Sequence, residues 1–494
     1  MLYLRVVKTK SKSRAVQVIR YHDGRRIIVK HIGSARDDDD LQVLTALAHE
    51  YISEIGSQAD LFPPSEQHSN LLLLNQAQYL GFYYTFLYDL IHSIQIQIGY
   101  TESTEGLLTD LVVMRIIEPC SKLRSIELME TYFGIRHRRQ RYYESALKWL
   151  DLKAIVEQQT LEFAKQKYGF NFSMLFYDVT TLYFETFEAD ELRKPGFSKD
   201  GKSQQPQILV ALMVTQDGFP VSYEVFAGNT FEGHTLLPVI QSFIKLHQVQ
   251  HFTVVADAAM ISTANVEALR AARISYIVGA RLGNIPDALF EQINTQLPRE
   301  EGRTIRIETA RGFLICSFSK QRYKKDSYEM NKQIEKARGL LSTPSKAQRV
   351  KFLRTDQKTA TLNEELISKT TALLGVKGYY TDLAESIADN QTVIARYHDL
   401  YKVEQAFRVS KSDLKTRPIF HFKEEPIKLH LLICFMALAV SKHIELRTKG
   451  SIRALITECK KITDARLQNK ITGKELRLRA PIPSDLQRQI SKLH

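Results

Sequence analysis

Three acidic residues stand where metal-dependent chemistry would need them: Asp178, Asp257 and Glu404. Asp178 and Asp257 follow the apolar segments 172–177 and 252–256, each typical of a buried strand, and Glu404 lies in a helical pattern. Carboxylates at neighbouring strand ends converge, and a third one on a packed helix completes a set of oxygen ligands. Mg²⁺ or Mn²⁺ prefers such ligands, and a pair of ions about 3.5 to 4 Å apart supports in-line phosphoryl transfer.

The segment around Glu404 predicts one face of a helix. Tyr397, Glu404 and Lys411 are seven residues apart, which places them in one row along a continuous helix. Leu400 and Phe407 fall on the same row, so the row is expected to face the interior. A carboxylate there is either neutralised by a cation or is a charge at the edge of the core.

Each acid also has an ordinary interpretation. A strand-end aspartate taken alone is more often a turn or helix-cap residue. Glu404 alone is compatible with a surface glutamate paired with Arg408 four residues later. The occurrence of all three acids at consistent places in one order of elements favours the catalytic interpretation.

The composition favours a polyanionic partner. The 494 residues include 68 Lys and Arg against 55 Asp and Glu, a net charge of +13. The four cysteines are widely separated, which argues against a zinc ribbon or a disulfide framework and fits a reducing cytoplasm. The start of the chain does not resemble a signal peptide, and the apolar run 431–440 is far shorter than the roughly 18 residues of a membrane span, so no membrane segment is expected.

The central part of the chain predicts an α/β domain. Strands are expected at 172–177, 207–215, 220–226, 252–256 and 274–280, with helices at 234–246 and 263–273. Three consecutive strands, a helix, a strand, a helix and a fifth strand is the order of a ribonuclease-H-like domain with a mixed five-stranded sheet.

The remaining periodicity divides the chain into six parts. Helices are expected at 41–55, 71–98, 106–117, 121–133, 142–168, 328–341 and 426–446, and further strands at 303–309 and 312–318. The parts are a small basic β domain (1–38), a helical DNA-binding or dimerisation region (39–170), the first part of the catalytic domain (171–285), an inserted β-rich subdomain (286–390), the second part with the Glu404 helix (391–446) and a basic tail (447–494).

These motifs resemble those of the DDE transposases of bacterial insertion sequences, in the group with a β-rich insertion before the Glu. That group carries the signature Tyr, two residues, Arg, three residues, Glu, six residues, Lys. Here it reads Tyr397, Leu400, Glu404, Lys411, with leucine in place of the arginine. In the segment of the second aspartate, Ala258 stands where the group usually has arginine.

The resemblance implies roles for individual residues. Asp178, Asp257 and Glu404 would be catalytic and would ligate two Mg²⁺ or Mn²⁺ ions. DNA contacts would come from Tyr397, Lys411, Lys415, Arg417 and Lys199.

The resemblance also implies the activity. The protein would be a DNA transposase of a mobile element, an endonuclease that cleaves the element ends and transfers the strands into target DNA. Its partners would be double-stranded DNA, as terminal inverted repeats and as target, and a second copy in a synaptic homodimer, in the bacterial cytoplasm at the nucleoid. Two alternatives remain open: a ribonuclease-H-like nuclease without strand transfer, and an inactive transposase-derived DNA-binding protein.

Overall fold

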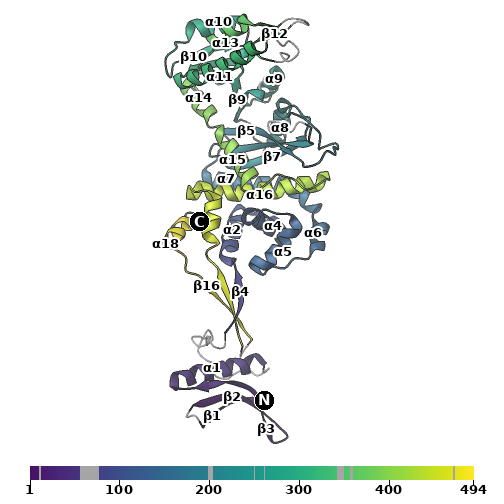
Figure 1. Cartoon of the computed structure of the whole chain (residues 1–494), viewed down its shortest axis with the longest axis vertical. Coiled ribbons are helices and arrows are strands. Elements are labelled where there is room, and N and C mark those ends of the chain that lie inside the picture. The colour runs from purple at the N-terminus through teal and green to yellow at the C-terminus, as the bar shows by residue number, and fades with distance from the viewer. Residues whose placement is uncertain are drawn as a thin grey trace.

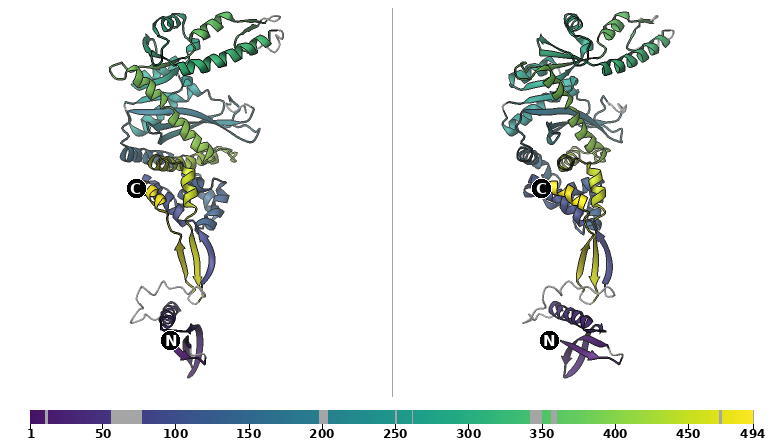
Figure 2. Two further views of the ribbon diagram at one scale, coloured as in Figure 1. Left: turned by 60° about the vertical axis from the view of Figure 1, so that its left-hand side comes forward. Right: turned by 90° about the vertical axis from the view of Figure 1, so that its left-hand side faces the viewer.

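The computed structural model describes residues 1–10, 13–55, 77–197, 204–249, 251–260, 262–341, 350–355, 360–470 and 473–493. The protein is elongated (Figure 1), with the N-terminal domain at one end and helices α10 (Asp287–Gln296) and α13 (Glu364–Ala372) at the other. The large sheet lies between the middle and the α10 end, as the turned views in Figure 2 also show.

One mixed sheet of eight strands forms the centre of the α/β part. Its order is β10-β11-β14-β9-β8-β5-β6-β7, and β8 is parallel to both β5 and β9. The strands are β5 (Met174–Tyr183), β6 (Gln207–Thr215), β7 (Pro220–Ala227), β8 (Thr253–Ala256), β9 (Ser275–Ala280), β10 (Thr304–Thr309), β11 (Gly312–Phe318) and β14 (Val376–Thr381). All nine residues of β6 are buried, which explains its nearly continuous apolar sequence.

The predicted β-rich insertion is only partly separate. Strands β10, β11 and β14 extend the main sheet, because β14 pairs with β9 in antiparallel register. The rest is mainly helical: a small core that includes Met330 and Phe352 joins α11 (Lys320–Gly339) and α13. A hairpin of β12 (Leu353–Thr355) and β13 (Ala360–Leu362) completes it.

Helix α16 (Glu424–Thr448) is the central core helix. It is long and apolar enough to span a membrane by length and composition, but 94% of its most apolar window is buried inside the protein. It contacts α4 (Gly106–Ile117) on one side and β7 on the other. In Figures 1 and 2 it runs between the large sheet and the helices α2 (Thr85–Ile98), α4 and α5 (Lys122–Phe133), which accounts for a helix that is apolar all round.

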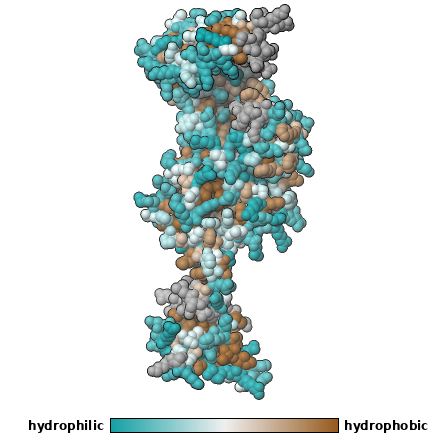
Figure 3. Space-filling model, in the orientation of Figure 1, coloured by the Kyte–Doolittle hydropathy of each residue, from teal (hydrophilic) through white to brown (hydrophobic). Residues whose placement is uncertain are grey.

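The N-terminal domain includes a helix that lies beyond the predicted domain boundary at residue 38. Strands β1 (Leu2–Lys8), β2 (Arg14–His22) and β3 (Arg25–Ala35) form a sheet, and α1 (Asp38–Ile55) packs on it through Leu44 and Leu47. The sheet cannot bury its apolar face alone, so the helix belongs with it. Figure 3 shows hydrophobic surface at this end of the molecule, where the exposed apolar residues include Tyr3, Tyr21, Ile27 and Ile28.

The helical region and the C-terminal segment form one body. Its first part contains α2 (Thr85–Ile98), α3 (Tyr100–Ser103), α4 (Gly106–Ile117), α5 (Lys122–Phe133), α6 (Arg139–Ser145) and α7 (Lys153–Tyr168). Its C-terminal part contains α17 (Ile452–Cys459), β15 (Asp464–Asn469), β16 (Glu475–Arg479) and α18 (Ser484–Ile490).

One prediction fails in this body, and the segment predicted only to be a basic tail contains helices and strands. The predicted helix 71–98 is helical only in α2; residues 77–83 form β4 (Ala77–Tyr83), and residues 71–76 lie outside the described part. The predicted basic tail is folded, because β15 pairs with both β4 and β16. Gly81 has φ +111° where the pairing register shifts, so this strand contains a bulge that only glycine adopts readily. The partner strands are almost 400 residues apart, a pairing that local periodicity does not reveal.

Candidate active site

Asp178 and Asp257 lie next to each other where β8 ends. The parallel register pairs Tyr177 with Ala256, so the next residues on the two chains are Asp178 and Asp257. Neighbouring strands lie about 4.8 Å apart, so the two aspartates lie side by side at the C-terminal end of β8. Asp178 does not end its strand as predicted: β5 continues to Tyr183, because β6 still pairs with it beyond the end of β8.

The two aspartates differ in exposure. Asp178 is half-buried, and its Oδ1 accepts a hydrogen bond of 2.8 Å from the backbone N–H of Val179. Asp257 is exposed, and its Oδ1 accepts one of 2.7 Å from Ala258. Both carboxylates therefore have one oxygen fixed by the adjacent backbone.

Glu404 lies on a separate helix from Tyr397, so the predicted single row does not exist. Tyr397 belongs to α14 (Asn390–His398) and Glu404 to the first turn of α15 (Tyr401–Ser412). Three i to i+3 bonds join them, donated by the backbone N–H groups of Leu400, Lys402 and Val403.

This tighter turn changes what Glu404 faces. Because a turn of this kind has about 3.0 residues instead of 3.6, the row is rotated at the junction. Leu400 and Phe407 are buried as expected, whereas Glu404 is exposed. Helix α15 packs on β5 and β6, which keeps the Glu404 helix over the strand that carries Asp178.

Tyr397 connects the second aspartate to this helix pair. Its hydroxyl donates a 3.3 Å hydrogen bond to Oδ1 of Asp257, and the side chain is only 8% exposed. Burial raises the pKa of Tyr397, and the carboxylates of Asp257 and Glu404 raise it further. The hydroxyl thus remains a donor to Oδ1 of Asp257, and the DNA contact that the resemblance implies for Tyr397 stays a prediction.

Lys377 of β14 is a functional candidate that sequence reasoning missed. Its Nζ lies 4.7 Å from the ring centroid of Tyr397 and 5.4 Å from that of Tyr379. Burial lowers the pKa of Lys377, and Arg322 acts in the same direction, while Asp257 and Glu404 oppose them. The available signal was a lysine inside the otherwise apolar segment 376–381, since lysine is rarely buried without a partner.

Lys411, at the end of α15, lies against β5. Its Nζ donates a hydrogen bond to Oγ1 of Thr180. Thr180 is two residues after Asp178 and therefore on the same face of the strand. Lys411 thus joins the Glu404 helix to the strand of the first aspartate.

The loop after α15 carries two predicted DNA contacts. Lys415 is exposed, and the guanidinium of Arg417 lies 5.3 Å from the ring centroid of Tyr183. Lys199, another predicted contact, lies outside the described residues.

Buried polar groups anchor this loop to α5 and α16. Nε2 of His430 lies 2.9 Å from the carbonyl oxygen of Thr416, and its Nδ1 lies 2.5 Å from Nζ of Lys122. Burial lowers the pKa of Lys122 to about 7 and the pKa of His430 well below its ordinary value. A neutral His430 accepts at Nδ1 and donates at Nε2, which fixes the backbone between Lys415 and Arg417.

The three acids have the right chemistry for a divalent ion but are not gathered around one point. Within the described ranges, no group of three or more His, Cys, Asp or Glu side chains is arranged to hold a metal ion. Their carboxylate oxygens suit Mg²⁺ or Mn²⁺, and Asp257 and Glu404 are open to solvent. The donor set therefore fits such an ion, provided that the side chains converge when it binds.

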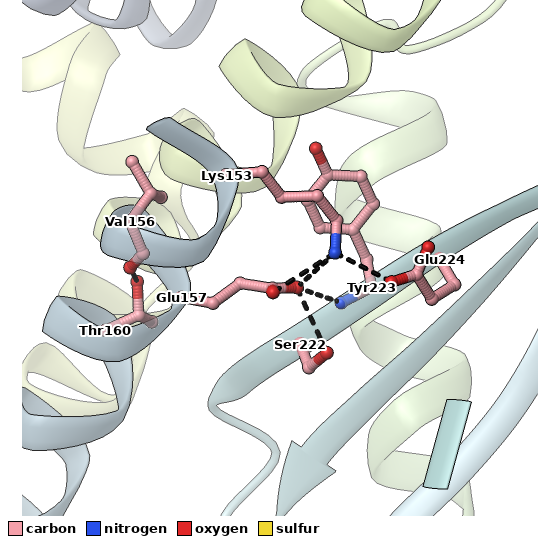
Figure 4. A network of polar contacts seen from close by, with 7 residues as sticks. All are labelled: Lys153, Val156, Glu157, Thr160, Ser222, Tyr223 and Glu224. Carbon is pink, nitrogen blue, oxygen red and sulfur yellow. Dashed lines mark hydrogen bonds and ion pairs between the residues drawn. The ribbon is translucent and has the colours of Figure 1, made fainter. Parts of the chain in front are cut away.

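A second acid–lysine cluster lies between α7 and β7 (Figure 4). Glu157 accepts hydrogen bonds from Oγ of Ser222 at 3.0 Å and from the backbone N–H of Tyr223 at 2.9 Å. Nζ of Lys153 lies 3.1 Å from both oxygens of Glu157 and 2.9 Å from Glu224. Glu157 is only 2% exposed and its oxygens are engaged by protein donors, so this cluster holds the helix to the sheet.

Comparisons with known proteins identify the family. No curated protein matches the chain. A cryo-EM structure of the piggyBac transposase synaptic complex with hairpin DNA is similar over 83% of this chain and 75% of that one. Its identity is 12% and its TM-score 0.37, values too low to support a conclusion. The family described as "Transposase DDE domain" matches residues 172–440, which is more than half of the chain, runs from β5 into α16 and includes the three acids. The chain therefore belongs to the DDE-domain transposase family.

Proposed function

We propose that the protein cleaves DNA at the ends of an insertion sequence and transfers the freed strands into target DNA. Asp178, Asp257 and Glu404 would be its catalytic acids. The observation that carries the proposal is the parallel register that makes Asp178 and Asp257 neighbours. The shared surroundings of Asp257 and Glu404 at Tyr397 and Lys377 support the third position.

The proposed fold of the catalytic part is ribonuclease-H-like. Its support is the order β7-β6-β5-β8-β9, with the first three strands antiparallel and consecutive and the last two parallel to β5. We assign the chain to the insertion-sequence group with the Tyr, Arg, Glu, Lys signature, of which Tyr397, Glu404 and Lys411 are present.

The residues of the proposed site have different roles. Asp178, Asp257 and Glu404 would hold Mg²⁺ or Mn²⁺, which, when bound, activates the attacking oxygen and stabilises the leaving one. Tyr397 fixes one oxygen of Asp257, so the other remains for a ligand. Lys411 holds α15, the helix of Glu404, to β5, the strand of Asp178.

The proposed partner is double-stranded DNA, as terminal inverted repeats and as target. The net charge of +13 supports it, and binding should weaken steeply with salt because phosphate contacts release counterions. We propose that a homodimer forms the synaptic complex, in the cytoplasm of a bacterium at the nucleoid.

The test is an end-cleavage assay with the full chain and the DNA that flanks its reading frame. Wild-type protein with Mg²⁺ is expected to cut at the repeat ends and to produce joined products with a second duplex. Glu404→Gln and Asp178→Asn should each abolish both reactions while the chain remains folded. Cleavage that persists in these variants contradicts the assignment of the acids.

The same assay separates the two rival functions. A nuclease would leave nicks but no joined products. An inactive DNA-binding protein would bind the repeats equally well with and without Mg²⁺ and would cut nothing.

A further inference from the structure

We propose that Lys377 is a catalytic residue whose ammonium group contacts the DNA phosphate that is being cleaved. This inference rests on the proposed function and adds a residue to it from β14, a strand outside the signature segment. The carrying observation is the position of Lys377 beside Tyr397, whose hydroxyl is bonded to Asp257.

Lys377 is connected to Asp257 through the side chain of Tyr397. Nζ of Lys377 lies 4.7 Å from the Tyr397 ring centroid, and the Tyr397 hydroxyl lies 3.3 Å from Oδ1 of Asp257. The ring centroids of Tyr379 and Tyr397 lie 4.9 Å apart, so the side chain of Lys377 packs against two aromatic rings. The side chain is half-buried and therefore restricted in direction.

The surrounding charges favour a ligand with negative oxygens. Asp257 and Glu404 attract the ammonium, while burial and Arg322 disfavour it. A divalent ion on the two acids would cancel that attraction and leave Lys377 as a positive group at the edge of the site. A DNA phosphate oxygen would then be the partner of its ammonium group.

Lys377 supplies a cation beside Tyr397 that the core residue Leu400 does not. Leu400 is 6% exposed and belongs to the core, so the signature position offers no cation to DNA. β14 lies two strands from β8 in the sheet, with β9 between them, and Nζ of its Lys377 lies 4.7 Å from the ring centroid of Tyr397.

The chemical role is electrostatic. In the hydrolysis, a water oxygen forms a bond to phosphorus while the bond from phosphorus to the 3′ oxygen breaks, and the 3′ oxygen takes up a proton. Lys377 would keep its own proton and donate hydrogen bonds to a non-bridging oxygen, where negative charge increases in the transition state.

The first experiment measures single-turnover end cleavage at saturating protein. Lys377→Ala should slow cleavage by about 100-fold, the order found when one such donor is removed. Lys377→Arg should stay within about threefold of wild type because it keeps the charge. The matched control is Lys369→Ala, which removes a surface lysine paired with Asp287 on α10 and should cleave like wild type.

The second experiment measures binding of an end duplex with one neutral methylphosphonate at the cleaved position. The neutral group should weaken binding to wild type by about tenfold and to Lys377→Ala by less than twofold, because the partner charge is already gone. Equal losses in both proteins, or cleavage by Lys377→Ala at the wild-type rate, overturn the proposal.

The two proposals fail in different ways. If wild type cuts as expected and Glu404→Gln does not, the proposed function stands whatever Lys377 does. If wild type cuts nothing, the proposed function fails, and the inference about Lys377 fails with it because no phosphate is cleaved.

Discussion

The protein has two clusters of acidic residues with a lysine, and similar residues serve different purposes in them. Between α7 and β7, Glu157 is enclosed by Lys153, Ser222 and Tyr223, and its oxygens are engaged by protein donors. In the candidate active site, Asp257 after β8 and Glu404 on α15 are exposed, and Nζ of Lys377 lies over the ring of Tyr397.

The difference shows what frees an acid for a ligand. A carboxylate whose lone pairs are filled by protein donors stabilises the fold and has little left to offer a metal or a phosphate. Asp257 has one oxygen fixed by Ala258 and Tyr397, and its exposed side chain leaves the rest open to solvent. A carboxylate that binds a metal needs hydrogen bonds from the protein that orient it and a free lone pair for the ion.

The largest expected effect separates the clusters by activity. Asp257→Asn should reduce end cleavage by about 1,000-fold or more, equivalent to about 4 kcal/mol of lost transition-state stabilisation. Glu157→Gln should cleave at nearly the wild-type rate per folded molecule. The measurement is single-turnover cleavage normalised to the folded fraction. A Glu157→Gln protein that is folded but inactive would show that the two clusters are not functionally distinct.

The next largest effect is on the free energy of unfolding, which should differ between variants of the two clusters. Glu157→Ala should lower the free energy of unfolding by about 3 to 5 kcal/mol, because it leaves Lys153 charged and half-enclosed without its main partner. Asp257→Ala should change it by about 0.5 kcal/mol or less, since an exposed acid with few contacts contributes little. Urea unfolding followed by circular dichroism measures both. Equal losses would mean that Asp257 is a structural acid.

A smaller effect tests the support of Asp257. Tyr397→Phe removes the hydroxyl but keeps the ring and should raise the Mg²⁺ concentration for half-maximal cleavage by about 10- to 100-fold, as loss of a ligand-orienting group does. Excess Mg²⁺ should restore the rate. Tyr379→Phe is the matched control, because its hydroxyl lies 3.3 Å from Nε2 of His398 and not at an acid. A similar requirement for Mg²⁺ in both variants would remove Tyr397 from the site.

The sequence predicted the elements of the sheet better than its extent. Strand β6 was confirmed at 207–215 because its apolar run is bounded by clear turn residues. The continuation of β5 past Asp178 was missed, since only the different lengths of β6 and β8 produce it. The joining of β10, β11 and β14 to the main sheet, and the pairing of β4 with β15, depend on contacts between distant segments.

The candidate site shows the same limit. The expectation that Asp178 and Asp257 are neighbours agrees with the strand register. The single helical row through Tyr397 and Glu404 was wrong, because a seven-residue spacing assumes an unbroken helix and the i to i+3 turn at Leu400 interrupts it. Lys377 belongs to a different strand, so no local motif could associate it with the acids.

The smallest expected effect compares the two lysines by their titration. Burial acts to lower the pKa of Lys153, but Glu157 and Glu224 raise it above the ordinary value. For Lys377, burial and Arg322 prevail over Asp257 and Glu404, so its pKa is lowered. Acetic anhydride reacts with the neutral amine. The pH of half-maximal labelling should therefore lie above about 10.4 for Lys153 and below it for Lys377.

Peptide mass spectrometry of the intact, briefly labelled protein gives both labelling midpoints, and comparing midpoints instead of rates removes the difference in accessibility. Adding Mg²⁺ should lower the Lys377 midpoint further, because an ion on Asp257 and Glu404 removes the attraction that favours the charged lysine. The Lys153 midpoint should not move, since Glu157 has no free oxygen for the ion. A shift of both midpoints, or of neither, would contradict the distinction between a closed structural cluster and an open one.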